Sequence, residues 1–342
     1  MDASGGSVFL NLLGAAKRAL IRAAASTQPL DSYNLRDKLK LTLLLNILLV
    51  LMPLSPMTFS QAGPVPVVLR PQPQTGAGER PALDQLVDVG GYRLHIKCIG
   101  SGSPTVILEA GLGGGSDDWD KVMPDVGKFA RVCSYDRPGE GKSDRAPRTL
   151  RRFGSHTYIE LRTGQQIVQD LHTLLAKAGV SGPYVLVGHS LGGLYAILYA
   201  NKYPKEIVGM VLVDASHPDQ SARAAALRGP EVAKRTHDGL MQNEEGADID
   251  EILARVRAAN WRSNIPLYVL MQGLVRPPPA GWSSDQWTQY MQAKREMQAD
   301  HARRSPNSKL IIAETSGHDI PEDQPELVID AIKQVVNLAR NK

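Results

Sequence analysis

Apolar and polar positions follow two alternating spacings from about residue 85 to the end of the chain. Short, nearly continuous apolar runs alternate with longer stretches in which apolar residues recur at helical spacing. Strands buried in a parallel sheet read as continuous apolar runs, whereas a helix that covers a sheet is apolar on one side only. The pattern therefore predicts an α/β fold with a mostly parallel sheet flanked by helices.

The predicted strands are bounded by polar or glycine-containing turns, and the first two form a hairpin that turns at Gly90 and Gly91. Strands are expected at 86–89, 92–99, 105–108, 130–135, 184–188, 207–213, 267–271 and 310–313. Helices are expected at 118–129, 165–178, 191–203, 282–304 and 327–338. The stretch 216–264 interrupts this alternation and is rich in Ala, Arg and Glu. We expect a helical insertion there.

The first 62 residues have a different pattern. A segment without any charge, 41–69, begins with the apolar run Leu41–Met52, which Pro53 and Pro56 interrupt. This run has the length of a signal-peptide core, and basic residues precede it. We expect either a cleaved signal peptide or a retained membrane anchor, with the later residues exported. An interfacial or transit-type helix at 7–26 and a buried core helix are the alternatives.

Composition and charge narrow the function further. The 342 residues carry a formal net charge of +4, of which residues 1–62 contribute +3. Residues 63–84 are rich in proline, so they are expected to form an extended linker ahead of one domain at 85–342. A nearly neutral domain, in a chain with only 4 Trp, 10 Tyr and 4 Phe, does not indicate a nucleic-acid partner. Two cysteines exclude a disulfide-rich mini-fold and a four-cysteine zinc site, and no motif predicts a metal or cofactor.

One motif carries the chemistry: Gly188-His189-Ser190-Leu191-Gly192, between a predicted strand and a predicted helix. A serine at such a turn has its hydroxyl held clear of the backbone, and the unpaired N–H groups of the helix face it. Side chains at Gly188 and Gly192 would collide with the neighbouring strand and helix. We predict that Ser190 is a nucleophile, the alternative being a serine that only caps the helix.

Four segments together resemble the α/β-hydrolase family, over about residues 86–338. They are GHSLGG at 188–193, YDRPGEGKSD at 135–144, EAGLGGG at 109–115 and SGHDI at 316–320. The resemblance implies a mostly parallel eight-stranded sheet with a helical cap at 216–264. It also implies an oxyanion loop at 109–115, where Ala110 replaces the histidine of many members, and the chain order serine, acid, histidine.

A serine hydroxyl needs a base within hydrogen-bond reach, and the chain has eight histidines. The resemblance assigns this role to His318. His189 adjoins the nucleophile in sequence, so its ring should point away from the hydroxyl. His217 is expected to be a loop histidine, with a place in the pocket as the alternative.

The acid that orients the imidazole is open to three assignments. Many family members carry it after the next-to-last strand, but here no carboxylate follows 267–271 until Asp285. Asp214 ends the strand at 207–213, and its VDAS context resembles some lipases of the family. We favour Asp214, with Asp285 and Asp219 as alternatives.

The resemblance also implies roles for backbone groups and cysteines. An oxyanion hole needs two converging N–H groups, which we expect from Leu112 and Leu191. The strands that carry Cys98 and Cys133 are neighbours in the strand order of this family, so a disulfide between them and two buried thiols are both compatible with the sequence.

The predicted function is a serine hydrolase that cleaves a small-molecule carboxylic ester through an acyl-enzyme. Lactonase, amidase, acyltransferase and carbon–carbon hydrolase activities use the same residues. A non-catalytic ligand-binding module on the same fold belongs to a different class. Ser190 argues against dehalogenases and epoxide hydrolases of the family, which carry a carboxylate at the nucleophile position.

Overall fold

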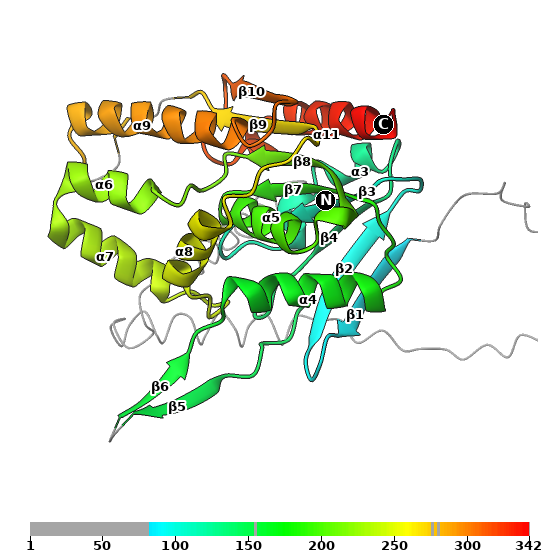
Figure 1. Cartoon of the computed structure of the whole chain (residues 1–342), viewed down its shortest axis with the longest axis horizontal. Coiled ribbons are helices and arrows are strands. Elements are labelled where there is room, and N and C mark those ends of the chain that lie inside the picture. Colours follow the sequence, from blue (N-terminus) through cyan, green and yellow to red (C-terminus); the bar gives the residue numbers. More distant parts are fainter. Residues whose placement is uncertain (1–81, 154–155, 275–276, 279–280, 342) are drawn as a thin grey trace, which may run out of the picture. The chain divides into compact units, whose positions relative to one another are not determined.

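A computed structural model describes residues 82–341, apart from 154–155, 275–276 and 279–280. An eight-stranded sheet with the order β1-β2-β4-β3-β7-β8-β9-β10 runs through this part of the chain (Figure 1). The strands from β4 to β10 pair in parallel, and β1 and β2 are antiparallel to their neighbours. Their bounds are Leu83–Asp88 (β1), Arg93–Ile99 (β2), Thr105–Glu109 (β3), Val132–Tyr135 (β4), Tyr184–His189 (β7), Ile207–Val213 (β8), Leu267–Gln272 (β9) and Ser308–Ala313 (β10). The predicted mostly parallel sheet is confirmed.

Helices cover both faces of this sheet. Successive residues of β7 alternate between two cores: Leu186 lies in the core with residues of α4, α5 and α8 (Ile249–Ala259), whereas Val185 and Val187 lie in the core with residues of η2, α3 and α11. Helix α5 is buried from Leu191 to Ala200, which explains why the sequence shows no polar side there. The bounds are Ser116–Trp119 (η2), Met123–Val126 (α3), Gly164–Lys177 (α4), Leu191–Lys202 (α5), Pro204–Glu206 (η3), Ile320–Asp323 (α10) and Pro325–Arg340 (α11).

The predicted insertion at 216–264 contains three helices: α6 (Gln220–Arg228), α7 (Pro230–Met241) and α8 (Ile249–Ala259). Helix α8 returns to the domain and buries Ile252 and Val256 in the core. Helix α9 (Ser284–Ala302) lies beside α6 and also packs on β9 and β10 (Figure 1). The insertion and α9 therefore form a helical cap at one end of the sheet.

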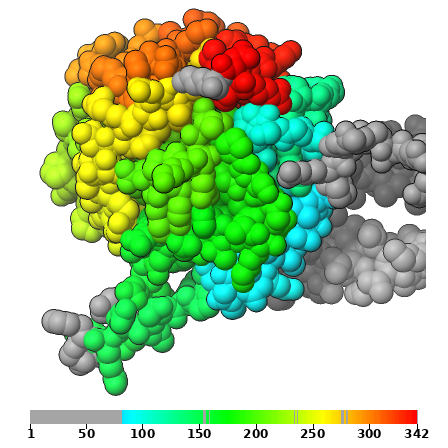
Figure 2. All heavy atoms as spheres, turned by 45° about the vertical axis from the view of Figure 1, so that its right-hand side comes forward, coloured from blue at the N-terminus to red at the C-terminus, as the bar shows by residue number. Residues whose placement is uncertain are grey.

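Two local predictions differ from the structure. The helix expected at 118–129 is replaced by η2 and the four-residue α3. Pro124 is the second residue of α3, and because it has no amide hydrogen it cannot continue the helical hydrogen bonds of an earlier turn. A hairpin of β5 (Thr149–Phe153) and β6 (His156–Glu160) was not predicted. Its cross-strand partners Leu150 and Ile159 are 66% and 46% exposed, so no buried side imposes an alternating pattern. Figure 2 shows this hairpin standing clear of the helices.

Cys98 on β2 and Cys133 on β4 are register partners, and a disulfide joins them in the structure. The leader predicted at 1–62 and most of the linker predicted at 63–84 lie outside the described residues. Within the part of the chain that is described, no helix is both long and apolar enough to cross a membrane.

Candidate active site

Ser190 occupies a strained turn between β7 and α5. Its φ of 52° lies in the left-handed region, which costs a non-glycine residue about 1–3 kcal/mol. A Cβ on Gly188 would lie 2.6 Å from the carbonyl oxygen of Gly192, and one on Gly192 would lie 2.4 Å from that of Ala110. Glycine at both positions therefore lets β7, α5 and the end of β3 approach closely enough to hold the serine in this turn.

A continuous chain of hydrogen bonds runs from Ser190 through His318 to Asp214. The Nε2 atom of His318 lies 2.9 Å from Ser190 Oγ, and its Nδ1 atom lies 2.5 Å from Asp214 Oδ2. An ionised carboxylate only accepts hydrogen bonds, so Nδ1 carries the proton and Nε2 is left to accept from the serine hydroxyl. Asp214 is buried, whereas the His318 side chain is 45% exposed. The imidazole is thus held on its buried side by Asp214 and exposed to solvent on the side of Ser190.

The three candidate acids occupy different places. Asp214 follows β8 and contacts His318, which lies in the loop after β10. Asp285 lies in the exposed first turn of α9. Asp219 accepts a surface hydrogen bond of 3.0 Å from Arg257 Nε. Of these three carboxylates, the structure brings only Asp214 to the imidazole.

Asp214 has a second cationic partner that the sequence analysis missed. The Nζ atom of Lys294 on α9 lies 2.5 Å from Asp214 Oδ2 and 2.5 Å from Oε1 of Gln272, and the backbone N–H of Gln272 donates to Asp214 Oδ1 at 3.2 Å. Burial alone would raise the pKa of Asp214, but the hydrogen bond from His318 and the charge of Lys294 outweigh it and hold the pKa below its usual value. The carboxylate therefore stays ionised.

His189 supports the loop that carries His318. Its Nε2 donates to the carbonyl oxygen of His318 at 3.0 Å, and the two ring centroids are 4.8 Å apart. Burial, with a smaller contribution from His318, lowers the pKa of His189 to about 4, so the ring is neutral at pH 7. His217 lies in the cap, where its Nε2 is 3.3 Å from Asp300 Oδ2. It is a buried structural histidine there.

Both predicted oxyanion residues adjoin Ser190. Leu191 follows Ser190 as the first residue of α5, where backbone N–H groups lack helical partners. Leu112 follows Gly111, whose Cβ, if it had one, would lie 3.3 Å from the Cβ of Ser190. A side chain at Gly111 would therefore crowd the place where a carbonyl carbon must approach the hydroxyl.

A buried arginine holds the loop that contains Leu112. Arg137, from the YDRPGEG segment, donates from Nη1 to the carbonyl oxygen of Ala110 at 2.8 Å and from Nη2 to that of Gly111. The same guanidinium pairs with buried Glu109, 2.6 Å from Nη1. These hydrogen bonds hold the backbone of the predicted oxyanion loop from its buried side.

The helical insertion reaches the same loop through Glu245. Its Oε1 lies 2.6 Å from Arg137 Nη2 and accepts a 3.3 Å hydrogen bond from the backbone N–H of Gly113. Its other oxygen accepts from Arg137 Nε at 2.9 Å. Because Glu245 is buried and bidentate on the guanidinium, it links the cap to the oxyanion loop through charge-assisted hydrogen bonds.

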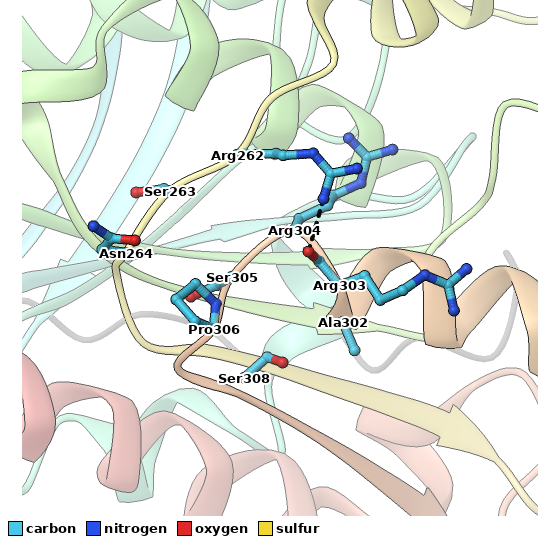
Figure 3. A pocket seen from close by; sticks show the side chains of 9 residues that line it. All are labelled: Arg262, Ser263, Asn264, Ala302, Arg303, Arg304, Ser305, Pro306 and Ser308. Carbon is cyan, nitrogen blue, oxygen red and sulfur yellow. Dashed lines mark hydrogen bonds between the residues drawn. The ribbon is translucent and has the colours of Figure 1, made fainter.

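A surface hollow of about 720 Å³ lies elsewhere (Figure 3). It is formed where Arg262–Asn264 and Ala302–Ser308 approach the amino ends of β9 and β10, whereas Ser190 follows the carboxyl end of β7. The hollow therefore lies at the amino ends of the parallel strands, and Ser190 lies at their carboxyl ends. The lining residues include no carboxylate, histidine or cysteine, so no side chain there could act as a base towards the hydroxyls of Ser263, Ser305 and Ser308.

The residues described hold no group of three or more His, Cys, Asp or Glu side chains that is arranged to bind a metal ion. The arrangement built around Ser190 instead provides a hydroxyl, a base in contact with it, a buried carboxylate and two nearby backbone amides. Together these groups can carry out nucleophilic attack on a carbonyl carbon and stabilise the resulting oxyanion.

Comparisons with known proteins identify the fold family of the chain. Residues 104–259 match a family model described as alpha/beta hydrolase fold. The chain is 31% identical over 241 residues to the uncharacterized protein YqjL of Bacillus subtilis, a match that covers 69% of this chain and 85% of that protein. It is also 31% identical over 148 residues to a 2-hydroxy-6-oxononadienedioate/2-hydroxy-6-oxononatrienedioate hydrolase of Klebsiella pneumoniae, covering 42% of this chain and 46% of that one.

Among solved structures, a thermophilic esterase from Thermogutta terrifontis superposes with a TM-score of 0.52 and 19% sequence identity. The superposition covers 76% of this chain and 99% of the esterase. At this identity the likeness concerns the fold.

Proposed function

This chain belongs to the α/β-hydrolase fold family, and on that premise we propose that it is a serine hydrolase that cleaves carboxylic esters through an acyl-enzyme intermediate. The observation that carries the proposal is the unbroken hydrogen-bond chain Ser190–His318–Asp214. A serine hydroxyl becomes an effective nucleophile only when a base in contact with it removes the proton.

The geometry supports a two-step reaction. Ser190 Oγ attacks the ester carbonyl as its proton passes to His318 Nε2, and the oxyanion accepts hydrogen bonds from the N–H groups of Leu112 and Leu191. Collapse of the intermediate releases the alcohol, which takes the proton from His318. Water then attacks the acyl-enzyme, giving its proton to His318, and the acid leaves as the proton returns to Ser190. Asp214 orients the imidazole throughout and stabilises its charged form.

A second candidate is carbon–carbon bond hydrolysis, because one relative bears the name of a 2-hydroxy-6-oxononadienedioate hydrolase. The two activities are separable with a p-nitrophenyl butyrate assay and a 2-hydroxy-6-oxo-dienoate assay on the same preparation. We expect the ester to be the better substrate by kcat/KM, and the reverse order would favour the second candidate.

The direct test is covalent labelling of the full-length chain. A fluorophosphonate reacts with activated serines, so we expect one adduct, on the peptide that contains Ser190, together with loss of p-nitrophenyl butyrate hydrolysis. The adduct is located by mass spectrometry. Full activity after complete labelling, or an adduct confined to another serine, would refute the proposal.

Glu245→Gln is expected to lower kcat/KM about tenfold to a hundredfold, because the neutral amide no longer pairs as a charged fork with Arg137 and the oxyanion loop loses part of its support. The change should fall mainly on kcat. Glu244→Gln is the matched control, since this neighbouring side chain is 65% exposed and pairs with Arg145 at the surface. Steady-state kinetics of both variants measure the effect. Equal activity of the two variants would contradict the proposal that Glu245 supports the oxyanion loop.

We also propose that the catalytic domain works outside the cytoplasm, after a leader or anchor at 1–62 and a linker at 63–84. The uncharged apolar run behind basic residues supports this, and so does the Cys98–Cys133 disulfide, because such bonds persist in oxidising compartments. Fusion of residues 1–84 to alkaline phosphatase, which is active only after export, tests the proposal. A fusion of 63–84 is the control, and equal inactivity of both fusions would count against export.

A further inference from the structure

The buried lysine beside the candidate triad is the feature that the proposed mechanism leaves unused. Lys294 lies on the side of α9 that faces the sheet, and only 7% of the residue is exposed. Its ammonium group and His318 Nδ1 share one oxygen, Asp214 Oδ2, at 2.5 Å each. A charge is seldom placed in such a position unless it is paired, because taking it out of water costs several kcal/mol.

The pair Lys294–Asp214 has an electrostatic consequence for His318. An isolated carboxylate next to an imidazole favours its protonated form, and a cation on the same oxygen opposes that effect. The base is active only when it is unprotonated. A lysine at this place therefore extends the activity of the base towards lower pH.

The pair also has a geometric consequence. Asp214 has a φ of 41°, in the left-handed region, which is uncommon for a residue other than glycine although aspartate tolerates it better than most. The Lys294 ammonium bonds to Asp214 and to the Gln272 side chain, while the Gln272 backbone bonds to the other carboxylate oxygen. This closed set of contacts ties the end of β8 to the end of β9 and aims the carboxylate at His318.

We propose that Lys294 is a positioning residue of the hydrolase site, which holds Asp214 in place and, by sharing its charge, keeps the His318 base functional in mildly acidic solution. The inference rests on the proposed function of Ser190, His318 and Asp214. It assigns to α9 of the cap a part in catalysis as well as in covering the site.

The other titratable groups around these residues do not supply a comparable cation. His189 is neutral at pH 7 because burial lowers its pKa to about 4, and burial raises the pKa of Tyr290, one turn before Lys294, to about 12. Other charged groups on α9 and on the elements packed against it and the His318 loop include Asp319, which follows His318 in the chain, and Asp300 on α9, which pairs with His217. They also include the exposed pair of Arg223 on α6 and Glu296 on α9.

The test compares pH profiles of kcat/KM for Lys294→Gln and Lys294→Arg in the full-length chain. Lys294→Gln should move the midpoint of the acid limb to higher pH by about one unit, since the glutamine keeps a hydrogen-bond donor but no charge. Lys294→Arg should keep the wild-type midpoint. Arg295→Gln, at an exposed position next along α9, is the matched control and should not move it.

An unchanged midpoint in folded Lys294→Gln would overturn the inference, and so would equal shifts in Lys294→Gln and Lys294→Arg, which indicate a purely steric role. If Lys294→Gln does not fold, Lys294→Met, which keeps the apolar stem, takes its place. The ring NMR signals of His318, followed against pH in the wild type and the variant, measure the same shift without turnover. They keep the inference testable even if fluorophosphonate labelling shows that the proposed function is wrong.

Discussion

Ser190→Ala is expected to reduce kcat/KM for p-nitrophenyl esters by about 10⁶-fold. The variant lacks the oxygen that forms the acyl-enzyme, and the remaining rate would come from binding and from the oxyanion donors alone. Substrate affinity should change little, because the alanine removes one atom from the site. Kinetics with freshly purified protein, and fluorophosphonate labelling of the same sample, measure both effects.

Two further variants make this result specific. Ser181 is an exposed serine just before the amino end of β7, whereas Ser190 follows the carboxyl end, so Ser181→Ala should leave activity unchanged. Ser190→Gly should be as inactive as Ser190→Ala. It should unfold at a higher temperature than Ser190→Ala, because glycine relieves the backbone strain at φ 52°. Activity within tenfold of the wild type in Ser190→Ala would exclude Ser190 as the nucleophile.

Asp214→Asn is expected to lower kcat/KM by about 10³- to 10⁴-fold. The amide can donate to His318 Nδ1, which favours the tautomer whose Nε2 carries the proton and cannot accept one from Ser190. The loss should appear in kcat, since Asp214 is buried behind the imidazole and does not meet the substrate. Asp285→Asn and Asp219→Asn, at exposed positions, should stay within about twofold of the wild type because neither carboxylate contacts His318.

The same substitution has a consequence for stability. Asp214→Asn leaves the buried ammonium of Lys294 without its carboxylate, and breaking a buried pair from one side costs about 3–5 kcal/mol. The melting temperature should therefore fall. In the double variant Asp214→Asn, Lys294→Met it should recover while activity stays low. A large activity loss in Asp285→Asn, with little in Asp214→Asn, would transfer the acid role to Asp285.

Much of the fold was predictable because its elements are encoded locally. The strand expected at 207–213 has these same bounds in the structure, since seven consecutive residues are buried or nearly so and turns bound them. The hairpin β5–β6 and the break of the 118–129 helix escaped prediction. The first has no buried face, and the second depends on one proline whose effect competes with a helical pattern.

The residues of the candidate site also differ in how far the sequence could predict them. A tight turn needs particular glycines at particular spacings, so the sequence by itself located Ser190, and the family resemblance located His318. The choice among Asp214, Asp219 and Asp285 depends on which strand end faces the histidine loop, a matter of how residues about a hundred positions apart are packed.

By itself, the sequence of this protein determined the sheet, most of its covering helices, the turn that carries Ser190 and the loops around it, because each rests on residues close together in the chain. Only the tertiary structure decided that Asp214 meets His318, that Lys294 meets Asp214, and that Glu245 of the cap supports the oxyanion loop through Arg137. The pairs Asp214–His318, Lys294–Asp214 and Glu245–Arg137 lie 104, 80 and 108 residues apart in the chain. Side chains so far apart leave no periodic trace in the sequence, since their contact is created by packing alone.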